Sequence, residues 1–166
     1  MIKLNQMKTI FAILVILTII SLNVFSQDSE KSLHNSIDKW HNAAAIADAN
    51  KFFGFMDSSS VYIGTDASER WMKDEFIKFA KPYFDRGKAW EFKAYDRHIT
   101  FSNDGMIAWF DELLETWMGN CRGSGVVIKN NKNWKLLHYH LSITVPNEKI
   151  YEFIDLINPP KEEINK

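Results

Sequence analysis

The sequence predicts an α+β fold in which two to three N-terminal helices pack on one face of a strongly curved antiparallel sheet. Two observations lead to this fold class. Up to about residue 87, apolar residues recur at steps of three and four, which is typical of helices. From Lys88 onward the pattern changes to extended segments separated by short turn signals, which is typical of an antiparallel meander.

The composition indicates one domain. The chain has 166 residues, of which 46% are hydrophobic and 14% aromatic, so it can fill one core but not two ordinary ones. We assign residues 27–158 to this domain. Residues 159–166 begin with Pro159-Pro160 and are mostly polar, so we expect a disordered tail.

Residues 1–26 are predicted to be a cleaved secretory signal peptide. Lys3 and Lys8 precede an apolar run over residues 10–20, and Val24-Phe25-Ser26 offers a cleavage site. The run is shorter than the roughly 20 residues that a membrane span needs. We therefore expect a secreted or periplasmic protein without stable membrane insertion, and an uncleaved anchor is the alternative.

The distribution of charge argues against a nucleic-acid partner, and the cysteine count excludes an internal disulfide. Lys and Arg number 20 against 21 Asp and Glu, and the cations are scattered along the chain, so no nucleic-acid partner is expected. Cys121 is the single cysteine and can form no internal disulfide. The core must therefore hold without covalent cross-links.

Helices are expected at residues 30–49, at residues 50–56 and from about Met72 to Gly87. The first helix is the best supported, because its apolar residues share one face: Leu33, Ile37, Trp40, Ala44 and Ala47. Between the second and third helices we expect a turn at residues 57–60, a short strand at residues 61–63 and a turn at residues 64–66.

Four longer strands are expected in the second half, at residues 89–102, 106–118, 122–129 and 134–145. The turn signals between them are short, so consecutive strands should pair antiparallel. A short helix over residues 148–157 is expected to follow.

Four short motifs carry a family resemblance: Tyr62-Ile63-Gly64-Thr65-Asp66, Ala108-Trp109-Phe110-Asp111-Glu112, Cys121-Arg122-Gly123-x-Gly125 and Trp134-Lys135-Leu136-Leu137-His138-Tyr139-His140-Leu141-Ser142. With this order of elements, residues 30–145 resemble the SnoaL-like group of the nuclear transport factor 2-like (NTF2-like) superfamily. The resemblance implies a cone with a pocket between the helices and the concave sheet, and frequent dimers through the outer sheet face. It also implies functions that range from isomerase and cyclase to pure binding.

Strand alternation predicts which side chains of the last strand face the helices. Its apolar set is expected to face inward: Leu137, Tyr139, Leu141, Ile143 and Val145. His138 and His140 then lie on the outer face. The last strand is also similar to that of the association domain of calcium/calmodulin-dependent kinase II, which places Leu141 in the pocket.

His138 and His140 are candidate metal ligands. Histidines at i and i+2 of a strand can share one ion, but zinc or iron needs a third protein ligand, and the other histidines lie in unrelated elements. We therefore expect no metal, and we interpret the pair as a hydrogen-bonded pair at the sheet surface or at a dimer contact.

Asp111 is the leading polar candidate for the pocket. It stands among apolar residues on its strand, where a carboxylate can contact a ligand or act as a general base. Both faces of this strand are apolar, so the register decides whether Asp111 or Glu112 points inward, and the kinase-domain resemblance favours Asp111. A buried ion pair with Arg97 or Arg122 is the structural alternative.

Cys121 and the nearby glycines have structural interpretations as well as functional ones. Arg122 beside Cys121 could lower the pKa of the thiol, but Cys-His catalysis needs a histidine on the same face, so a packed thiol is favoured. Gly123 and Gly125 are too few for a phosphate-binding loop and indicate a bulge or a close backbone approach.

These observations predict a pocket that binds a small apolar or amphipathic molecule. Its leading polar contacts are Asp111, Arg97 and Tyr139, and its further candidates are Trp109, Tyr62 and Leu141. No cofactor is expected, and the protein should be a homodimer. One alternative is an isomerase-type or hydrolase-type enzyme with Asp111 as base, although the position of the ketosteroid isomerase base holds Ile63 here. The other is a protein-interaction module that uses the outer sheet face.

Overall fold

The computed structural model describes Phe11, residues 29–131 and residues 133–158. The predicted signal peptide, apart from Phe11, and the predicted tail lie outside these residues. Residues 29–45 form a helix, followed by α2 (Ala49–Phe55), β1 (Met56–Ile63), β2 (Arg70–Met72) and α3 (Lys73–Asp85). The second half holds β3 (Lys93–Phe101), β4 (Ile107–Thr116), β5 (Gly119–Asn130), β6 (Asn133–Ile143), the 3₁₀ turn η1 (Asn147–Lys149) and α4 (Ile150–Ile157).

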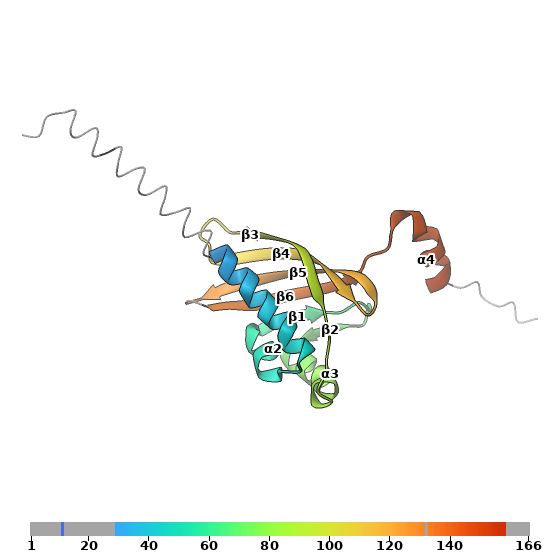
Figure 1. Ribbon diagram of the computed structural model, residues 1–166, viewed down its shortest axis with the longest axis horizontal. Coiled ribbons are helices and arrows are strands. Elements are labelled where there is room, and N and C mark those ends of the chain that lie inside the picture. Colours follow the sequence, from blue (N-terminus) through green and yellow to red (C-terminus); the bar gives the residue numbers. More distant parts are fainter. Residues whose placement is uncertain (1–10, 12–28, 132, 159–166) are drawn as a thin grey trace, which may run out of the picture.

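The strands form one curved, open sheet in the order β2-β1-β6-β5-β4-β3 (Figure 1). Strands β3 to β6 pair antiparallel in sequence order, which confirms the predicted meander. Strand β1 pairs in parallel with β6, and β2 pairs antiparallel with β1. The predicted α+β fold class is therefore confirmed.

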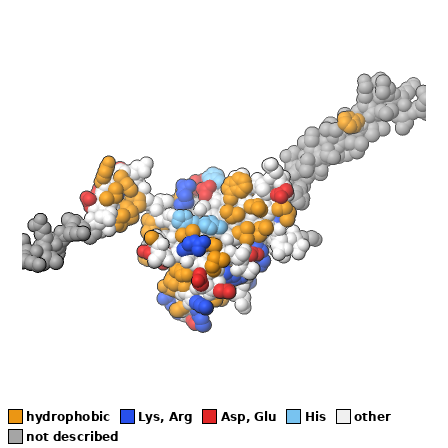
Figure 2. All heavy atoms as spheres, turned by 180° about the vertical axis from the view of Figure 1, so that it is seen from behind, with side chains coloured by type: hydrophobic (Ala, Val, Ile, Leu, Met, Phe, Trp, Pro, Cys, Tyr) orange, Lys and Arg blue, Asp and Glu red, His pale blue; other side chains and the backbone are white. Residues whose placement is uncertain are grey.

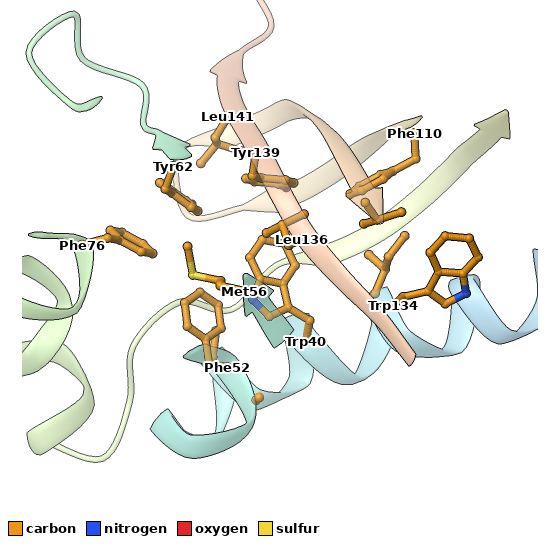
Figure 3. Close-up of a cluster of buried hydrophobic side chains, with 14 of the residues drawn as sticks. Trp40, Phe52, Met56, Tyr62, Phe76, Phe110, Trp134, Leu136, Tyr139 and Leu141 are labelled. Carbon is orange, nitrogen blue, oxygen red and sulfur yellow. The ribbon is translucent and has the colours of Figure 1, made fainter. Parts of the chain in front are cut away.

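The N-terminal helix crosses the concave face of the sheet, and α2 and α3 lie at the β1 end (Figure 1). Leu33, Ile37, Trp40 and Ala44 are buried, as their spacing predicts. Ala47 is an exception, because it has a positive φ of 54° and lies beyond the end of this helix. The core between helices and sheet is rich in aromatic rings, and Tyr62 and Phe76 stack at a centroid distance of 4.0 Å (Figure 3).

Two local predictions near β1 are wrong. Residues 57–60 belong to β1 and not to a turn, although the pairing of β1 with β6 is irregular between Met56 and Val61. The irregularity has a local cause, since Asp57 Oδ1 accepts hydrogen bonds from the backbone N–H and the hydroxyl of Ser59. Strand β2 was not expected. It is only three residues long and forms because the turn after Gly64 brings the chain back along β1.

A register shift in β6 changes which leucine faces inward. Val126 pairs with His138 and Val127 pairs with Leu136, so Leu137 has no partner on β5. Leu136 is therefore fully buried, and the inward placement predicted for Leu137 is wrong. Beyond the shift Tyr139 and Leu141 are buried and His138 and His140 lie on the outer face, as predicted. Ile143, at the end of β6, was expected inward but is 46% exposed, and Val145 lies beyond the strand.

The edge strand β3 also carries an irregularity. Its register with β4 shifts between Tyr95 and His98, and Asp96 within the shift has a positive φ of 49°. Three charged or ionisable side chains lie along this edge with large exposure: Lys93, Asp96 and His98.

Helix α4 confirms the short helix predicted at the C-terminal end, but it projects away from the sheet (Figure 1). Its apolar side chains are substantially exposed, including Tyr151 at 79% and Leu156 at 76%. Among the described helices, none is long and apolar enough to cross a membrane.

Candidate functional site: a buried charge network beneath an aromatic pocket

Glu112 is a fully buried acid in the middle of β4. Its neighbours on the inward face are apolar, because the strand alternates and Ala108, Phe110 and Leu114 point in the same direction. A carboxylate in such a place is costly unless charged or hydrogen-bonding groups surround it.

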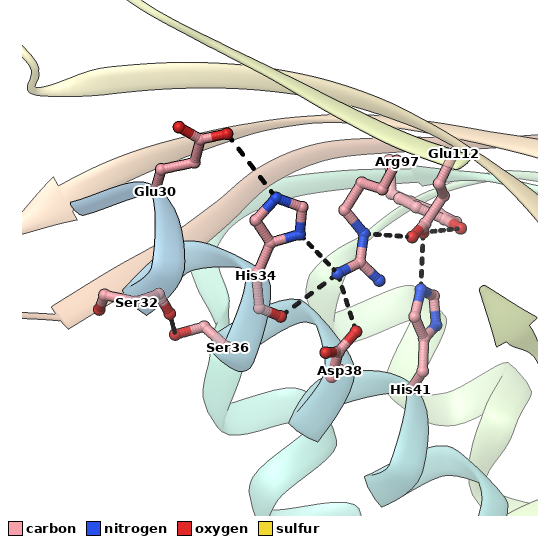
Figure 4. Close-up of polar contacts among 9 residues, drawn as sticks. Glu30, Ser32, His34, Ser36, Asp38, His41, Arg97 and Glu112 are labelled. Atoms are coloured by element: carbon pink, nitrogen blue, oxygen red, sulfur yellow. Dashed lines mark hydrogen bonds and ion pairs between the residues drawn. The ribbon is translucent and has the colours of Figure 1, made fainter. Parts of the chain in front are cut away.

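Three side chains satisfy the Glu112 carboxylate (Figure 4). His41 Nε2, from the N-terminal helix, lies 2.6 Å from Oε1, and Arg97 Nε, from β3, donates to Oε2 at 2.7 Å. The Tyr139 hydroxyl, from β6, donates to Oε1 at 3.4 Å. The carboxylate therefore ties the helix to three strands of the sheet.

Arg97 connects this buried acid to the surface. Its side chain is only 6% exposed, and its Nη1 lies 2.8 Å from Oδ1 of Asp38, whose side chain is 62% exposed. The same nitrogen donates to the backbone carbonyl of His34 at 3.3 Å (Figure 4). The guanidinium thus bridges a buried and an exposed carboxylate.

Burial and partners act in opposite directions on the Glu112 carboxyl. Burial alone would raise its pKa, but the hydrogen bond and charge of His41 and the charge of Arg97 outweigh this effect, so the pKa lies below its ordinary value. Burial raises the pKa of Tyr139 well above its ordinary value, and the charge of Glu112 adds to this. At neutral pH the network therefore contains an ionised Glu112 and a protonated Tyr139.

The predicted inward orientation of Asp111 is wrong. Its side chain is 44% exposed on the outer face, where Oδ1 lies 3.2 Å from Nη1 of Arg122. Trp109, another pocket candidate, is on the same outer face and 48% exposed. The reason is register: Glu112 pairs with Gly123 of β5, whose missing side chain leaves inward space for Glu112 and Tyr139.

A separate pocket of about 510 Å³ lies at the open end of the cone, between α3, the segment after it and the turn from β4 to β5. Its wall is mostly aromatic: Tyr62, Trp71, Phe76, Phe79, Tyr83, Trp90, Phe92 and Trp117. Leu141 lines it as well, so the structure brings Tyr62 and Leu141 together here. Polar side chains at this pocket include Glu69, Arg86 and Lys88.

The charge network lies behind the wall of this aromatic pocket and does not line it. Tyr62 contacts Tyr139 at a ring centroid distance of 5.5 Å, and Phe92 contacts His41 edge-on at 6.1 Å. These two pocket residues separate the cavity from Glu112. Of the predicted polar contacts, Arg97 and Tyr139 therefore meet each other at Glu112, one layer deeper than the cavity.

The histidine pair and the cysteine lie on opposite faces of the sheet. Cys121 is fully buried, with its sulfur 3.5 Å from Thr116 Oγ1, whereas His138 and His140 lie outside. Cys121 thus packs as a small core residue, as favoured by the sequence, and has neither histidine on its face. Burial and the charge of His140 lower the pKa of His138. Within the described residues, no group of three His, Cys, Asp or Glu could hold a metal ion.

Sequence reasoning missed Glu112, His41, His34 and Asp38 as members of one network. The sequence does indicate that three of these side chains lie together, because His34, Asp38 and His41 recur at steps of four and three beside the apolar face of the first helix. The pairing of β4 with β5 also indicates that Glu112, and not Asp111, points inward. The turn at Trp117-Met118 pairs Thr116 with Gly119, and counting back along both strands places Glu112 opposite Gly123.

Comparison with protein-family models gives one match, to the SnoaL-like domain, over residues 33–146. The match covers the N-terminal helix from Leu33, the whole sheet and α3. No curated protein matches the chain.

Solved structures show the same fold at low identity. An NTF2-like protein of unknown function from Pseudomonas putida KT2440 superposes with a TM-score of 0.61 at 13% identity, covering 74% of this chain and 92% of the other. A domain of unknown function with a cystatin-like fold, from Nostoc punctiforme PCC 73102, gives a TM-score of 0.66 at 15% identity, covering 81% and 89%. At these identities the likeness concerns the fold alone.

Proposed function

Because the chain belongs to the family of SnoaL-like domains, we propose that its aromatic pocket binds a small apolar or amphipathic molecule. The observation that carries this proposal is the cavity of about 510 Å³ lined by three tryptophans and several other rings. This volume lies within the range of about 300–1,000 Å³ of small-molecule sites, whose walls are mainly apolar.

The polar groups of the pocket suggest how such a ligand would be oriented. The Arg86 guanidinium lies 4.6 Å from the centroid of the Tyr83 ring, and the Lys88 ammonium is 2.9 Å from Glu91. Both cations are exposed beside an aromatic wall. A flat apolar body against the rings, with a polar or anionic end toward Arg86, matches this arrangement.

The test is binding of the neutral apolar probe N-phenyl-1-naphthylamine, followed by its fluorescence. Ala89 lines the pocket and is half-buried, so Ala89→Trp should fill the cavity and weaken probe binding at least tenfold. Asn42→Trp adds the same side chain at an exposed site of the N-terminal helix that lines no part of this pocket, and should bind like wild type. Absence of saturable binding to the wild type, or equal loss in both variants, would refute the proposal.

General-base catalysis is not part of this proposal. Asp111 lies on the outer face, and Glu112 is fully buried with its oxygens occupied by His41, Arg97 and Tyr139. A base must come within hydrogen-bond reach of its substrate, and neither acid lines the aromatic pocket.

We also propose that the outer sheet face forms a homodimer. On this face Ile107 is 39% and Trp109 is 48% exposed, and Val126 of β5 pairs with both Trp109 and His138. Figure 2 shows hydrophobic side chains beside histidine side chains on one face of the molecule. The apolar residues are contiguous, because Ile107 pairs with Ile128 and Trp109 pairs with Val126 on the neighbouring strand. Such a continuous apolar surface favours burial against a second copy.

Light scattering during size-exclusion chromatography tests the dimer. Trp109→Lys should give a monomer, because a buried charge at the centre of the interface would be unpaired. Trp117→Lys is the matched control, since Trp117 is 81% exposed but lies in the turn between β4 and β5, at the aromatic pocket. A monomeric wild type, or dissociation in both variants, would contradict the proposal.

We propose export to a secreted or periplasmic location, and this proposal rests only on the sequence of residues 1–26, the predicted signal peptide. The measurement is the intact mass of the full-length protein expressed in a bacterial host with a secretory pathway. A mass that begins at Gln27, in the periplasm or medium, is the expected result. A cytoplasmic protein that retains residues 1–26 would contradict it.

A further inference from the structure

A second cavity lies on the other side of the N-terminal helix, away from the aromatic pocket. It has a volume of about 720 Å³ and runs between this helix, α2 and the start of β6. Its walls carry four lysines and neutral polar residues: Lys31, Lys39, Lys51, Lys135, Ser32, Ser36, Asn35 and Asn133. We name this cavity the lysine groove.

Among the described residues no carboxylate lines the lysine groove, although acidic residues slightly outnumber basic ones in the whole chain. Lys31 and Lys39 are exposed and have no ion-pair partner among the described residues. Lys51 pairs with Asp48 at 2.8 Å, and the Lys135 ammonium donates to the backbone carbonyl of Gly54. In the described part of the chain, Lys31 and Lys39 thus have no charged partner, whereas Lys51 and Lys135 each have one polar partner.

Spacing along the helix explains why the free cations gather here. Lys31, Asn35 and Lys39 recur at steps of four, so they lie in one row on the helix face that borders β6. Asn35 stands between the two lysines, so this helix face presents two cations about two turns apart with an amide between them.

Two tryptophans close the floor of the lysine groove. Trp40 and Trp134 line it, and their side chains are 2% and 4% exposed. The indole Nε1 of each is buried without a hydrogen-bond acceptor in the described part of the protein.

We propose that the lysine groove binds a small soluble molecule that carries several phosphate or sulfate groups. Lysine ammonium groups bind tetrahedral oxyanions as point charges, and the serine and asparagine side chains add neutral donors. The cavity is large enough for a ligand with more than one such group, and nothing in its lining repels an anion. This site is distinct from the aromatic pocket and does not depend on the function proposed for it.

The test uses inorganic triphosphate and sucrose octasulfate as probes, titrated by calorimetry at low and moderate salt. At least one probe should bind wild type saturably, with an affinity that falls as salt rises. Lys31→Gln/Lys39→Gln should weaken this binding more than tenfold. Lys78→Gln/Lys93→Gln changes the net charge equally with exposed lysines outside the groove, and should alter affinity less than twofold.

The two probes separate phosphate from sulfate as the preferred group. Both double variants should keep the wild-type circular dichroism spectrum and melting temperature, because the lysines they change are exposed. If neither probe binds, or if both double variants lose affinity equally, the groove is not a specific site and the proposal is overturned. Lys39→Glu provides a second check, since charge reversal should abolish binding in a folded protein.

Discussion

Glu112 is held in the core by His41, Arg97 and Tyr139, so its charge is balanced where it lies. We expect Glu112→Gln to lower the free energy of unfolding by about 3–5 kcal/mol, because Arg97 would lose its buried counter-charge. Urea denaturation measures this. Asp111→Asn on the same strand is the matched control, and should cost less than about 1 kcal/mol because its ion pair is exposed.

The same residue should make stability depend on acid pH. The folded-state pKa of Glu112 lies below its ordinary value, so its contribution is complete above about pH 4.5 and is lost as the pH falls through the lowered pKa. Wild type should therefore lose stability between pH 5 and pH 3 more steeply than Glu112→Gln. Parallel melting-temperature profiles of the two proteins would show that Glu112 is not the group responsible.

Position 123 needs glycine because a side chain there would collide with Tyr139 and crowd Glu112, and not because of its backbone conformation. A Cβ at this position would overlap the Tyr139 hydroxyl and approach Glu112 Oε1 to 3.3 Å. We expect Gly123→Ala to destabilise the fold by about 1–3 kcal/mol, as overpacked core sites do. In Gly123→Ala/Tyr139→Phe the obstructing hydroxyl is gone, so chemical denaturation should show less than the sum of the two single effects.

At the scale of elements, α4 stands apart from the rest of the protein. Its apolar residues remain exposed, and among the described elements its extensive contact is with the adjoining turn η1. Deletion of residues 147–166 should therefore change the free energy of unfolding by no more than about 0.5 kcal/mol. A much larger loss in calorimetry would show that α4 packs on the core in solution.

The elements themselves could largely be predicted from the sequence. Apolar periodicity located the N-terminal helix and α3, and turn residues separated β3 to β6. The local errors arose where tertiary pairing overrides composition. Asp57 and the serines after it have the composition of a turn, yet pairing with β6 draws them into β1. Leu136 and Leu137 cannot be told apart by alternation, because a register shift is invisible until both strands are aligned.

At the scale of the whole molecule, the candidate site was harder to predict than the fold. Arg97 and Tyr139 were predicted as polar contacts of the ligand pocket together with Asp111, but they meet each other at Glu112, and neither lines the aromatic pocket. The aromatic pocket brings together residues from α3, from β1, β2 and β6 and from the segments between elements, which sequence spacing cannot relate. Which rings surround a cavity and which fill the core depends on how the cone closes.

One core joins all the described strands and the first three helices, so the protein should unfold as a single unit. Far-ultraviolet circular dichroism and tryptophan fluorescence should give coincident urea transitions for a protein that begins at residue 27. Separate midpoints would indicate that the helices and the sheet lose structure independently.

The two edges of the open sheet bear on how the protein can associate. Strand β2 offers only three residues of unpaired backbone, and β3 is interrupted by the shift at Asp96 and bordered by charged side chains. Short, charged and irregular edges are poor templates for another strand. The sheet therefore resists growth by strand addition, which guards this aromatic-rich chain against fibrous aggregation and leaves the faces of the molecule as its available surfaces for self-association.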